Sequence, residues 1–174
     1  MKFALAFAAL LIAVMLFAAT RPDTFRVERK IVISAPPEKI QAQIHNFERW
    51  KAWSPYEKKD PAMKRSYSGP ESGVGAQYGW EGDDNVGSGS MEVLSSTPQE
   101  VRIKLDFLKP FEAHNTAIFS FKAQSDGTEV SWAMEGPVPY FAKIIHLFFN
   151  MDKMIGGDFS AGLSDLKIVT ETQP

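Results

Sequence analysis

One stretch decides the fold of this chain: residues 140–170, YFAKIIHLFFNMDKMIGGDFSAGLSDLKIVT. Its apolar side chains recur at intervals of three, four and seven residues, which is typical of one apolar stripe along a helix. The stripe consists of Phe141, Ile144, Ile145, Phe148, Ile155, Phe159, Leu163 and Leu166. Burying about eight such side chains would contribute on the order of 10–25 kcal/mol. We therefore expect one long helix from Tyr140 to Thr170, packed against an extensive apolar surface.

That apolar surface is predicted to come from β strands between residues 25 and 135. Apolar and polar residues alternate, as in strands with one buried face, in Phe25–Ser34, Gln99–Leu108, Ala113–Gln124 and Thr128–Glu135. Arg29 interrupts the alternation of the first strand. Further strands are expected at Met63–Ser68, Val74–Trp80 and Val86–Ser96, and two short helices at Pro37–Asn46 and Phe47–Trp53.

Glycine is concentrated in the middle of this region, at positions 73, 75, 79, 82, 87 and 89. Inside strands, glycine marks bends, bulges or close backbone approach, so we expect a strongly curved sheet. Hairpin-length links between successive strands indicate an antiparallel meander. The predicted fold is α+β, a helix-grip arrangement with a curved antiparallel sheet of six to seven strands around the long C-terminal helix. The space between sheet and helix is either filled by side chains or forms a pocket.

The first 24 residues are predicted to be an appendage to a domain at residues 25–174. Phe3–Thr20 is uncharged and rich in Ala, Leu and Phe. At 1.5 Å per residue, a helix of this length would extend about 27 Å, close to the roughly 30 Å hydrocarbon core of a bilayer. We interpret residues 3–20 as a single-span membrane anchor, which predicts a membrane protein whose orientation is open. The alternatives are a signal peptide, although the potential cleavage sites place large residues where small ones are needed, and a buried helix.

The composition excludes several functional classes. The formal net charge is −2 over 174 residues, which gives no electrostatic basis for binding nucleic acid. Cysteine is absent, so disulfides, thiolate metal sites and a cysteine nucleophile are excluded. No histidine pair has metal-ligand spacing and no serine lies in a nucleophile elbow, so we expect neither a metal nor a cofactor.

Several short motifs have a familiar form: Ala35-Pro36-Pro37-Glu38, residues 50–55, Tyr67-Ser68-Gly69-Pro70 with Gly73-Val74-Gly75, Trp80-Glu81-Gly82, residues 87–90 and residues 151–159. Together they resemble the START-like (SRPBCC) superfamily, in its polyketide cyclase/dehydrase and lipid-transport subgroup. The resemblance spans roughly residues 25–170 and implies a helix-grip fold that binds hydrophobic ligands under the long helix. It is weak for activity, because members include aromatase/cyclases, lipid carriers and chaperone-binding modules.

A ligand pocket would be lined mainly by aromatic residues with few polar groups. The predicted ligand-binding set is Trp53, Tyr78, Trp80, Phe107, Phe119, Trp132, Phe148 and Met151. Each aromatic taken alone is more simply explained as core. For the set we favour a pocket, because a filled core would leave the curvature of the glycine-rich sheet unexplained.

The ionisable residues that deserve testing for acid–base chemistry are Glu81, His114 and Asp152, with Asp106 and Asp158. A useful base would need burial to tune its pKa. Asp106 alternates outward, and His114 and Asp152 have simple structural explanations. The resemblance implies that a cyclase would use a pocket arginine with tyrosine or acidic partners. No such arginine can be assigned, because Arg102 is on the polar face and Arg65 is in a short edge-like strand.

The glycine pair Gly156-Gly157 falls inside the predicted long helix, where it costs roughly 2 kcal/mol of helix propensity. It serves either close packing of the helix on the sheet or a hinge that admits a ligand.

Three functions remain. The first is a membrane-anchored domain that binds or carries a hydrophobic small molecule or lipid without chemistry. The second is a cyclase or dehydratase acting on a polyketide-like or aromatic substrate, favoured if Glu81, His114 or Asp152 is buried and aimed into the cavity. The third is a protein-interaction module with a filled cavity. Ligand identity, protein partners and oligomeric state are not predicted.

Overall fold

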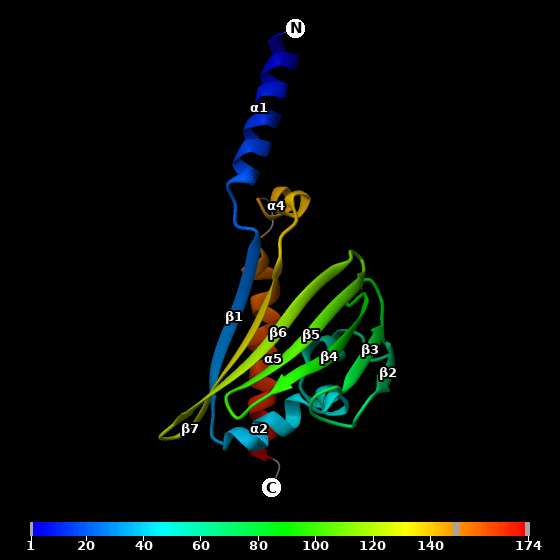
Figure 1. Cartoon of the computed structure of the whole chain (residues 1–174), viewed down its shortest axis with the longest axis vertical. Helices are drawn as coiled ribbons and strands as arrows, with labels where there is room; N and C mark the ends of the chain where they lie inside the picture. The colour runs from blue at the N-terminus through cyan, green and yellow to red at the C-terminus, as the bar shows by residue number, and fades with distance from the viewer. Residues whose placement is uncertain (1, 148–149, 173–174) are drawn as a thin grey trace.

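A computed structural model describes residues 2–147 and 150–172 of the chain. Seven antiparallel strands form one sheet in the order β1-β7-β6-β5-β4-β3-β2 (Figure 1). The strands are β1 Thr24–Ile33, β2 Lys64–Ser68, β3 Gln77–Glu81, β4 Ser88–Ser96, β5 Glu100–Lys109, β6 Ala113–Gln124 and β7 Gly127–Pro137. The helices are α1 Lys2–Ala19, α2 Pro37–Ile44, the 3-10 helix η1 Phe47–Ala52, α3 Pro55–Lys59, α4 Tyr140–His146 and α5 Met151–Thr172. The predicted α+β class and the curved antiparallel sheet with a long C-terminal helix are confirmed.

The hydrophobic core lies between the sheet and α5, which crosses behind the sheet in Figure 1. Phe159, Leu163 and Leu166 are fully buried and come from one face of α5, because they are spaced by four and three residues. Phe159 stacks on Trp132 of β7 with ring centroids 4.2 Å apart. The C-terminal half of the predicted stripe is therefore the part that packs against the sheet.

The prediction of one uninterrupted helix from Tyr140 to Thr170 is wrong. The structure contains α4 and α5 instead, and Asn150 explains where α5 begins. Its side-chain oxygen accepts a hydrogen bond from the backbone N–H of Lys153 at 3.0 Å, as an N-cap residue does. Phe141, at the start of the predicted stripe, is 72% exposed. Phe148 lies outside the described residues.

The prediction of a membrane anchor at residues 3–20, and with it the membrane localisation, is also wrong. Within the two described segments, no helix is both long and apolar enough to cross a membrane. The last turns of α1 also contact the domain: Ala18 is buried, and the Tyr140 hydroxyl donates to the carbonyl of Met15 at 2.7 Å. The proposed boundary between residues 24 and 25 stays a prediction.

Arg29 interrupts the alternation of β1 because its side chain reaches α5. Its guanidinium forms two hydrogen bonds with the carboxylate of Asp152, at 2.8 and 2.9 Å, and one with the backbone carbonyl of Asp152. The guanidinium lies directly over Gly156, where a Cβ atom would collide with it. Gly156 therefore provides the space for an arginine that joins the first strand to the first turns of α5.

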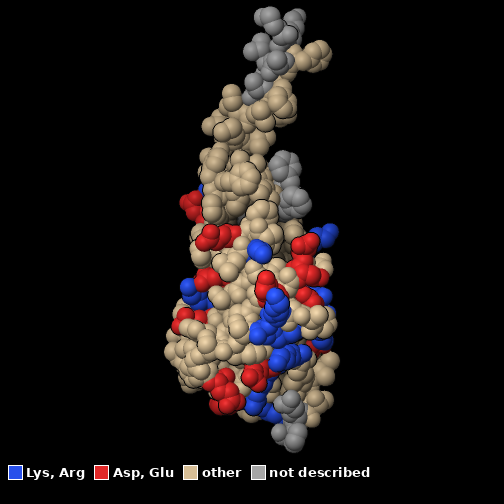
Figure 2. All heavy atoms as spheres, turned by 90° about the vertical axis from the view of Figure 1, so that its right-hand side faces the viewer, with Lys and Arg blue, Asp and Glu red and all other residues tan. Residues whose placement is uncertain are grey.

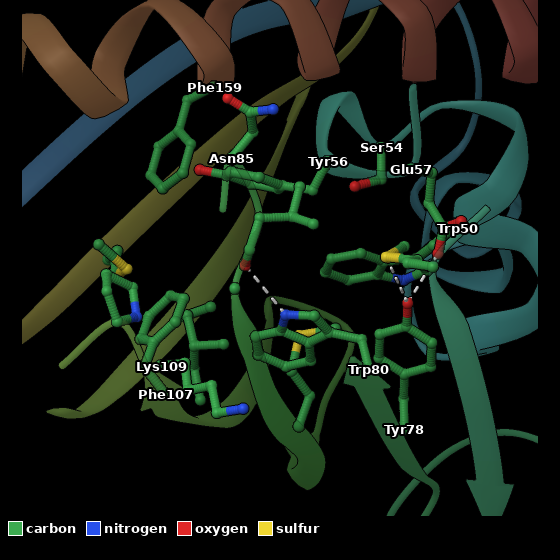
Figure 3. A pocket seen from close by; sticks show the side chains of 18 of the residues that line it. Trp50, Ser54, Tyr56, Glu57, Tyr78, Trp80, Asn85, Phe107, Lys109 and Phe159 are labelled. Atoms are coloured by element: carbon green, nitrogen blue, oxygen red, sulfur yellow. Dashed lines mark hydrogen bonds between the residues drawn. The ribbon is translucent and has the colours of Figure 1, made fainter. Parts of the chain in front are cut away.

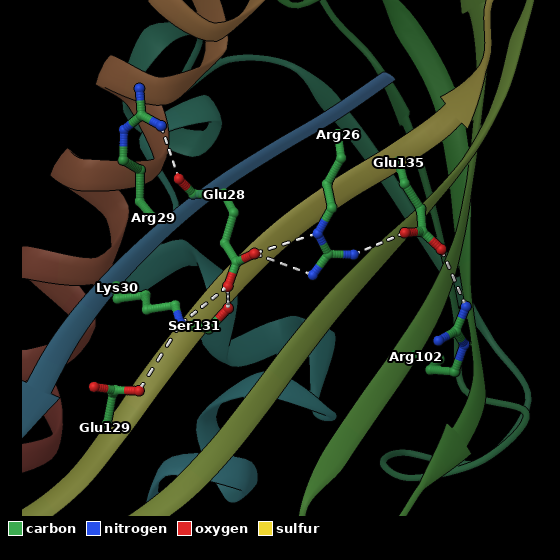
Figure 4. Close-up of polar contacts among 8 residues, drawn as sticks. All are labelled: Arg26, Glu28, Arg29, Lys30, Arg102, Glu129, Ser131 and Glu135. Carbon is green, nitrogen blue, oxygen red and sulfur yellow. Dashed lines mark hydrogen bonds and ion pairs between the residues drawn. The ribbon is translucent and has the colours of Figure 1, made fainter. Parts of the chain in front are cut away.

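The face of the sheet away from α5 carries a network of ion pairs (Figure 4). Arg26 of β1 bridges Glu28 and Glu135, and Glu135 also contacts Arg102 of β5 at 3.4 Å. The Ser131 hydroxyl donates to Glu28, and this bond, with those from Arg26, lowers the pKa of Glu28. Figure 2 shows acidic and basic side chains interspersed over the visible face of the domain. On the sheet face away from α5, charged strand residues thus pair with one another, as a solvent-exposed face allows.

Two glycines of α5 should respond oppositely to substitution by alanine. Gly157 is exposed with open space where a Cβ would lie, so Gly157→Ala should stabilise the protein by up to about 1 kcal/mol through helix propensity. At Gly162 a Cβ would lie 2.7 Å from Trp132 and 2.9 Å from Pro55, so overpacking should make Gly162→Ala destabilising by about 1–2 kcal/mol. Urea unfolding of the two variants measures both effects. Equal shifts of the same sign would contradict the packing described.

His45 should make stability depend on pH. Its Nδ1 is buried with no hydrogen-bond partner in the described part of the chain. Burial, with a smaller effect of Arg49, lowers the pKa of His45. The unfolded chain, with a histidine pKa near 6.5, therefore binds the proton first, so stability declines as pH falls below about 6.5. We expect His45→Gln to gain stability relative to the wild type between pH 7.5 and 5.5 in urea unfolding; a constant difference would contradict this.

Candidate functional site

A cavity of about 280 Å³ lies between the concave face of the sheet and the helices α3 and α5 (Figure 3). Its wall is built mainly from aromatic and aliphatic side chains, with contributions from β3 to β7. The aromatic residues that line it include Trp50, Tyr78, Trp80, Phe107, Trp132 and Phe159. This volume is just below the range of small-molecule sites, and the apolar lining is typical of them.

The pairing of the strands aligns the side chains of the cavity wall. Tyr78 of β3 lies opposite Met91 of β4, which lies opposite Leu105 of β5, so all three share one face of the sheet. In the neighbouring set of paired positions, Gly89 of β4 lies opposite both Trp80 of β3 and Phe107 of β5.

Gly89 allows the aromatic wall to close. A Cβ at this position would lie 2.5 Å from the ring of Trp80. Without one, Trp80 and Phe107 meet edge to face across the gap, with centroids 5.7 Å apart. The Trp80 indole N–H also donates to the carbonyl of Val86 at 3.2 Å, which fixes the ring. The sheet has a bulge between Ser88 and Gly89, as expected from the glycine-rich sequence.

One corner of the cavity is polar and is formed by Ser54, Glu57 and Tyr78 (Figure 3). The Tyr78 hydroxyl donates to the carboxylate of Glu57 at 2.8 Å. Arg65 reaches the same carboxylate from the other side, with Nε at 2.8 Å and Nη2 at 2.7 Å. Burial, and then the bond to Glu57, raise the pKa of Tyr78, so its phenol keeps its proton. The corner therefore holds an ion-paired carboxylate and neutral hydroxyls.

Three further polar residues of the lining lie in a loop or at the end of a strand. Asp84 and Asn85 belong to the loop between β3 and β4, and Lys109 ends β5. All three are exposed. They form a polar rim, and the rest of the lining is mainly apolar apart from the corner at Glu57 and the phenol of Tyr56.

The structure brings together four residues of the predicted ligand-binding set around this cavity: Tyr78, Trp80, Phe107 and Trp132. Trp53 and Phe119 are fully buried core residues that do not line it. Met151 is half-buried at the start of α5 and is also outside the lining, and Phe148 lies outside the described residues. Whether the four lining residues contact a ligand stays a prediction.

The three candidate catalytic residues lie at the surface, away from the lining. Glu81 faces Lys64 at 3.4 Å, Asp152 pairs with Arg29, and the His114 ring contacts Asp106 at 2.8 Å. Burial alone would raise the pKa of Asp106, but its bonds to Lys104 and His114 hold that pKa below its usual value.

Asp158, the last ionisable residue considered, pairs with Lys59 of α3 at 2.6 Å. Every ionisable residue singled out in the sequence therefore has a partner on the protein. Among the described residues, no cluster of three or more His, Cys, Asp or Glu side chains could hold a metal ion. The expectation of no cofactor stays a prediction.

The sequence analysis missed Ser54, Tyr56 and Glu57, because it ended the preceding helix at Trp53 and placed the next element, a strand, at Met63. The signal was present. Serine followed by proline is a helix start, with Ser54 at the N-cap and Pro55 at the first helical position, and α3 begins there. Recognising α3 would have placed Glu57 on a helix that faces the sheet.

Comparisons with known proteins agree with this architecture. Residues 24–171 match the model of the family "Polyketide cyclase / dehydrase and lipid transport". No curated protein matches the sequence.

Solved structures share the fold at low sequence identity. A protein from Chromobacterium violaceum is 17% identical, with a TM-score of 0.59 over 88% of this chain and 100% of that one. The Aha1 dimer from Colwellia psychrerythraea gives 17% identity and a TM-score of 0.60 over 85% and 97%. The di-domain ARO/CYC StfQ from the steffimycin biosynthetic pathway gives 8% identity and a TM-score of 0.60, over 85% of this chain and 51% of StfQ.

The family match covers most of the chain, and the sheet, the C-terminal helix and the apolar cavity are what the sequence motifs implied. The chain belongs to the polyketide cyclase/dehydrase and lipid-transport family of the START-like superfamily.

Proposed function

We propose that this domain binds and carries a hydrophobic small molecule or lipid in the cavity between sheet and α5, without chemistry. The observation that carries the proposal is the cavity itself, which is walled by Trp80, Phe107, Trp132 and Phe159. When an apolar ligand displaces water from apolar surface in such a space, the complex is stabilised by about 25 cal/mol per Å² of surface buried. A protein-interaction module with a filled interior would lack this space.

The ionisable groups at the cavity support binding rather than acid–base chemistry. A general base must be placed to take a proton from the substrate and needs a pKa near the working pH. Glu57 is engaged by Arg65 and Tyr78, and burial raises the pKas of Tyr56 and Tyr78 further from neutrality. The candidates Glu81, His114 and Asp152 lie outside the lining.

A cyclase-like enzyme is the second candidate function, because the Tyr78–Glu57–Arg65 cluster has the residue types that the family resemblance implies for cyclases. Its arginine, however, is directed to Glu57 and to backbone carbonyls of Met63 and Pro61, and does not line the cavity. Conversion of a bound polyketide-like substrate by the wild type, lost in Tyr78→Phe, would favour the enzyme. Binding without conversion supports the carrier.

Titration of the full chain with N-phenyl-1-naphthylamine, a neutral apolar fluorophore, tests the proposal. We expect saturable fluorescence enhancement with one site per chain, because the cavity offers one apolar space of about 280 Å³. A long-chain alcohol should displace the fluorophore competitively. Failure to reach saturation, or displacement by no apolar compound, would contradict the carrier function.

A further inference from the structure

The polar corner of the cavity contains a helix-capping sequence whose capping hydrogen bonds do not form. Ser54-Pro55-Tyr56-Glu57 has the spacing of a capping box, in which the serine hydroxyl and the glutamate carboxylate bond reciprocally to each other's backbone N–H groups. Neither bond forms here. The Ser54 side chain makes no cap bond, and the Ser54 N–H donates instead to the carbonyl of Trp50 at 2.7 Å. The Glu57 carboxylate is held by Tyr78 and Arg65. Neither side chain therefore caps the N-terminus of α3.

The Ser54 hydroxyl is left facing the cavity. Ser54 is 2% exposed, and its hydroxyl makes no capping bond to α3. Figure 3 shows it pointing into the space beside Tyr56 and Glu57. A hydroxyl that faces the cavity can form a hydrogen bond with a bound molecule, which adds to the affinity. The corner therefore offers one hydroxyl beside a buried carboxylate.

The hydrogen-bonding capacity of the corner selects for a ligand that donates. The protonated Tyr78 hydroxyl donates its hydrogen bond to Glu57, so the Tyr78 oxygen and the remaining acceptor capacity of Glu57 can only accept. Ser54 can accept or donate. A ligand O–H can donate to these acceptors and accept from Ser54.

A ligand carboxylate would instead face the negative charge of Glu57. Arg65 offers it little relief, because its guanidinium lies behind Glu57 and outside the lining. Like charges brought together in a desolvated site are unfavourable.

We propose that the Ser54–Glu57–Tyr78 corner binds the hydroxyl group of the ligand, so that the cavity prefers alcohols and phenols to carboxylates with the same apolar skeleton. The proposal rests on the proposed carrier function and adds the chemical class of the ligand. The hydroxyl enters between Ser54 and Glu57, and the hydrocarbon part extends toward Trp80 and Phe107.

Three matched probes test the proposal on the full chain: naphthalene, 2-naphthol and 2-naphthoate, each competed against the fluorophore at pH 7. We expect 2-naphthol to bind about five-fold more tightly than naphthalene, as one added hydrogen bond provides, and 2-naphthoate to bind most weakly. Ser54→Ala should bring 2-naphthol to the affinity of naphthalene. It should not lower the urea midpoint, because the substitution removes no capping bond of α3.

Ser164→Ala is the matched control. Ser164 is exposed on α5, where its hydroxyl bonds to the carbonyl of Ser160, away from the cavity. This variant should retain the preference for 2-naphthol. Equal affinities of the wild type for the three probes, or an equal loss of all three in Ser54→Ala, would overturn the hydroxyl site while leaving the carrier function in place. Absence of binding by every probe would overturn the carrier function and this inference together.

Discussion

Replacing Leu105 with tryptophan should reduce the affinity for an apolar fluorophore by at least about ten-fold. Leu105 is half-buried on β5 and lines the cavity in the same row as Tyr78 and Met91. An indole at this position would extend into the space that the ligand needs. Because the cavity has only about 280 Å³, the loss of one indole volume leaves little room for a ring system. Fluorophore titration of Leu105→Trp measures the effect directly.

Leu94→Trp provides the matched control for Leu105→Trp. Leu94 is on the neighbouring strand β4, is exposed and does not line the cavity, so the same substitution there should leave binding unchanged. Overpacking at position 105 would cost about 1–3 kcal/mol, so circular dichroism and urea unfolding should accompany the titration to show that the variant is folded. A folded Leu105→Trp variant with unchanged affinity would show that the ligand binds elsewhere.

Replacing Arg65 with methionine should destabilise the domain by about 3 kcal/mol. The Arg65 and Glu57 side chains are 17% and 4% exposed, and removing one partner of a buried ion pair leaves the other charge uncompensated. The neighbouring Lys64→Met is the control. Lys64 pairs with Glu81 at the surface, and such a pair contributes at most about 1 kcal/mol. Urea unfolding at pH 7 compares the two variants.

One further result would identify Glu57 as the cause of the Arg65 effect. The double variant Glu57→Gln/Arg65→Met should recover part of the lost stability, because no charge remains buried. A deficit of the same size in the double variant would contradict the buried ion pair.

The fold was predictable from periodicity because strands and helix each bury one face. The alternation along β5, β6 and β7 and the spacing of Phe159, Leu163 and Leu166 are local patterns. The division of the last third into α4 and α5 was missed because Asn150 acts as an N-cap through its side chain, and asparagine fits a helix interior or a cap. The membrane anchor was predicted from the hydrophobicity of residues 3–20 alone. The burial of Ala18 and the hydrogen bond from Tyr140 to Met15 depend on tertiary structure, which that pattern does not reveal.

The site was predictable only in part, for a different reason. Trp80, Phe107 and Trp132 could be named because aromatic residues on one strand face point the same way. The packing of distant elements decides which aromatic residues line the cavity and which fill the core. Trp53 and Phe119, for example, are fully buried and do not line the cavity. The corner at Glu57 could not be assembled, because it joins residues of α3 to Arg65 and Tyr78 across the sheet edge.

Native mass spectrometry of the full chain, purified under mild conditions and then extracted for lipids, tests most directly that the cavity holds an apolar ligand. We predict a complex with one small organic molecule per chain, and that this molecule carries a hydrophobic skeleton. The Leu105→Trp variant should be recovered without it. A wild-type chain recovered bare that also fails to take up the apolar fluorophore would contradict the account.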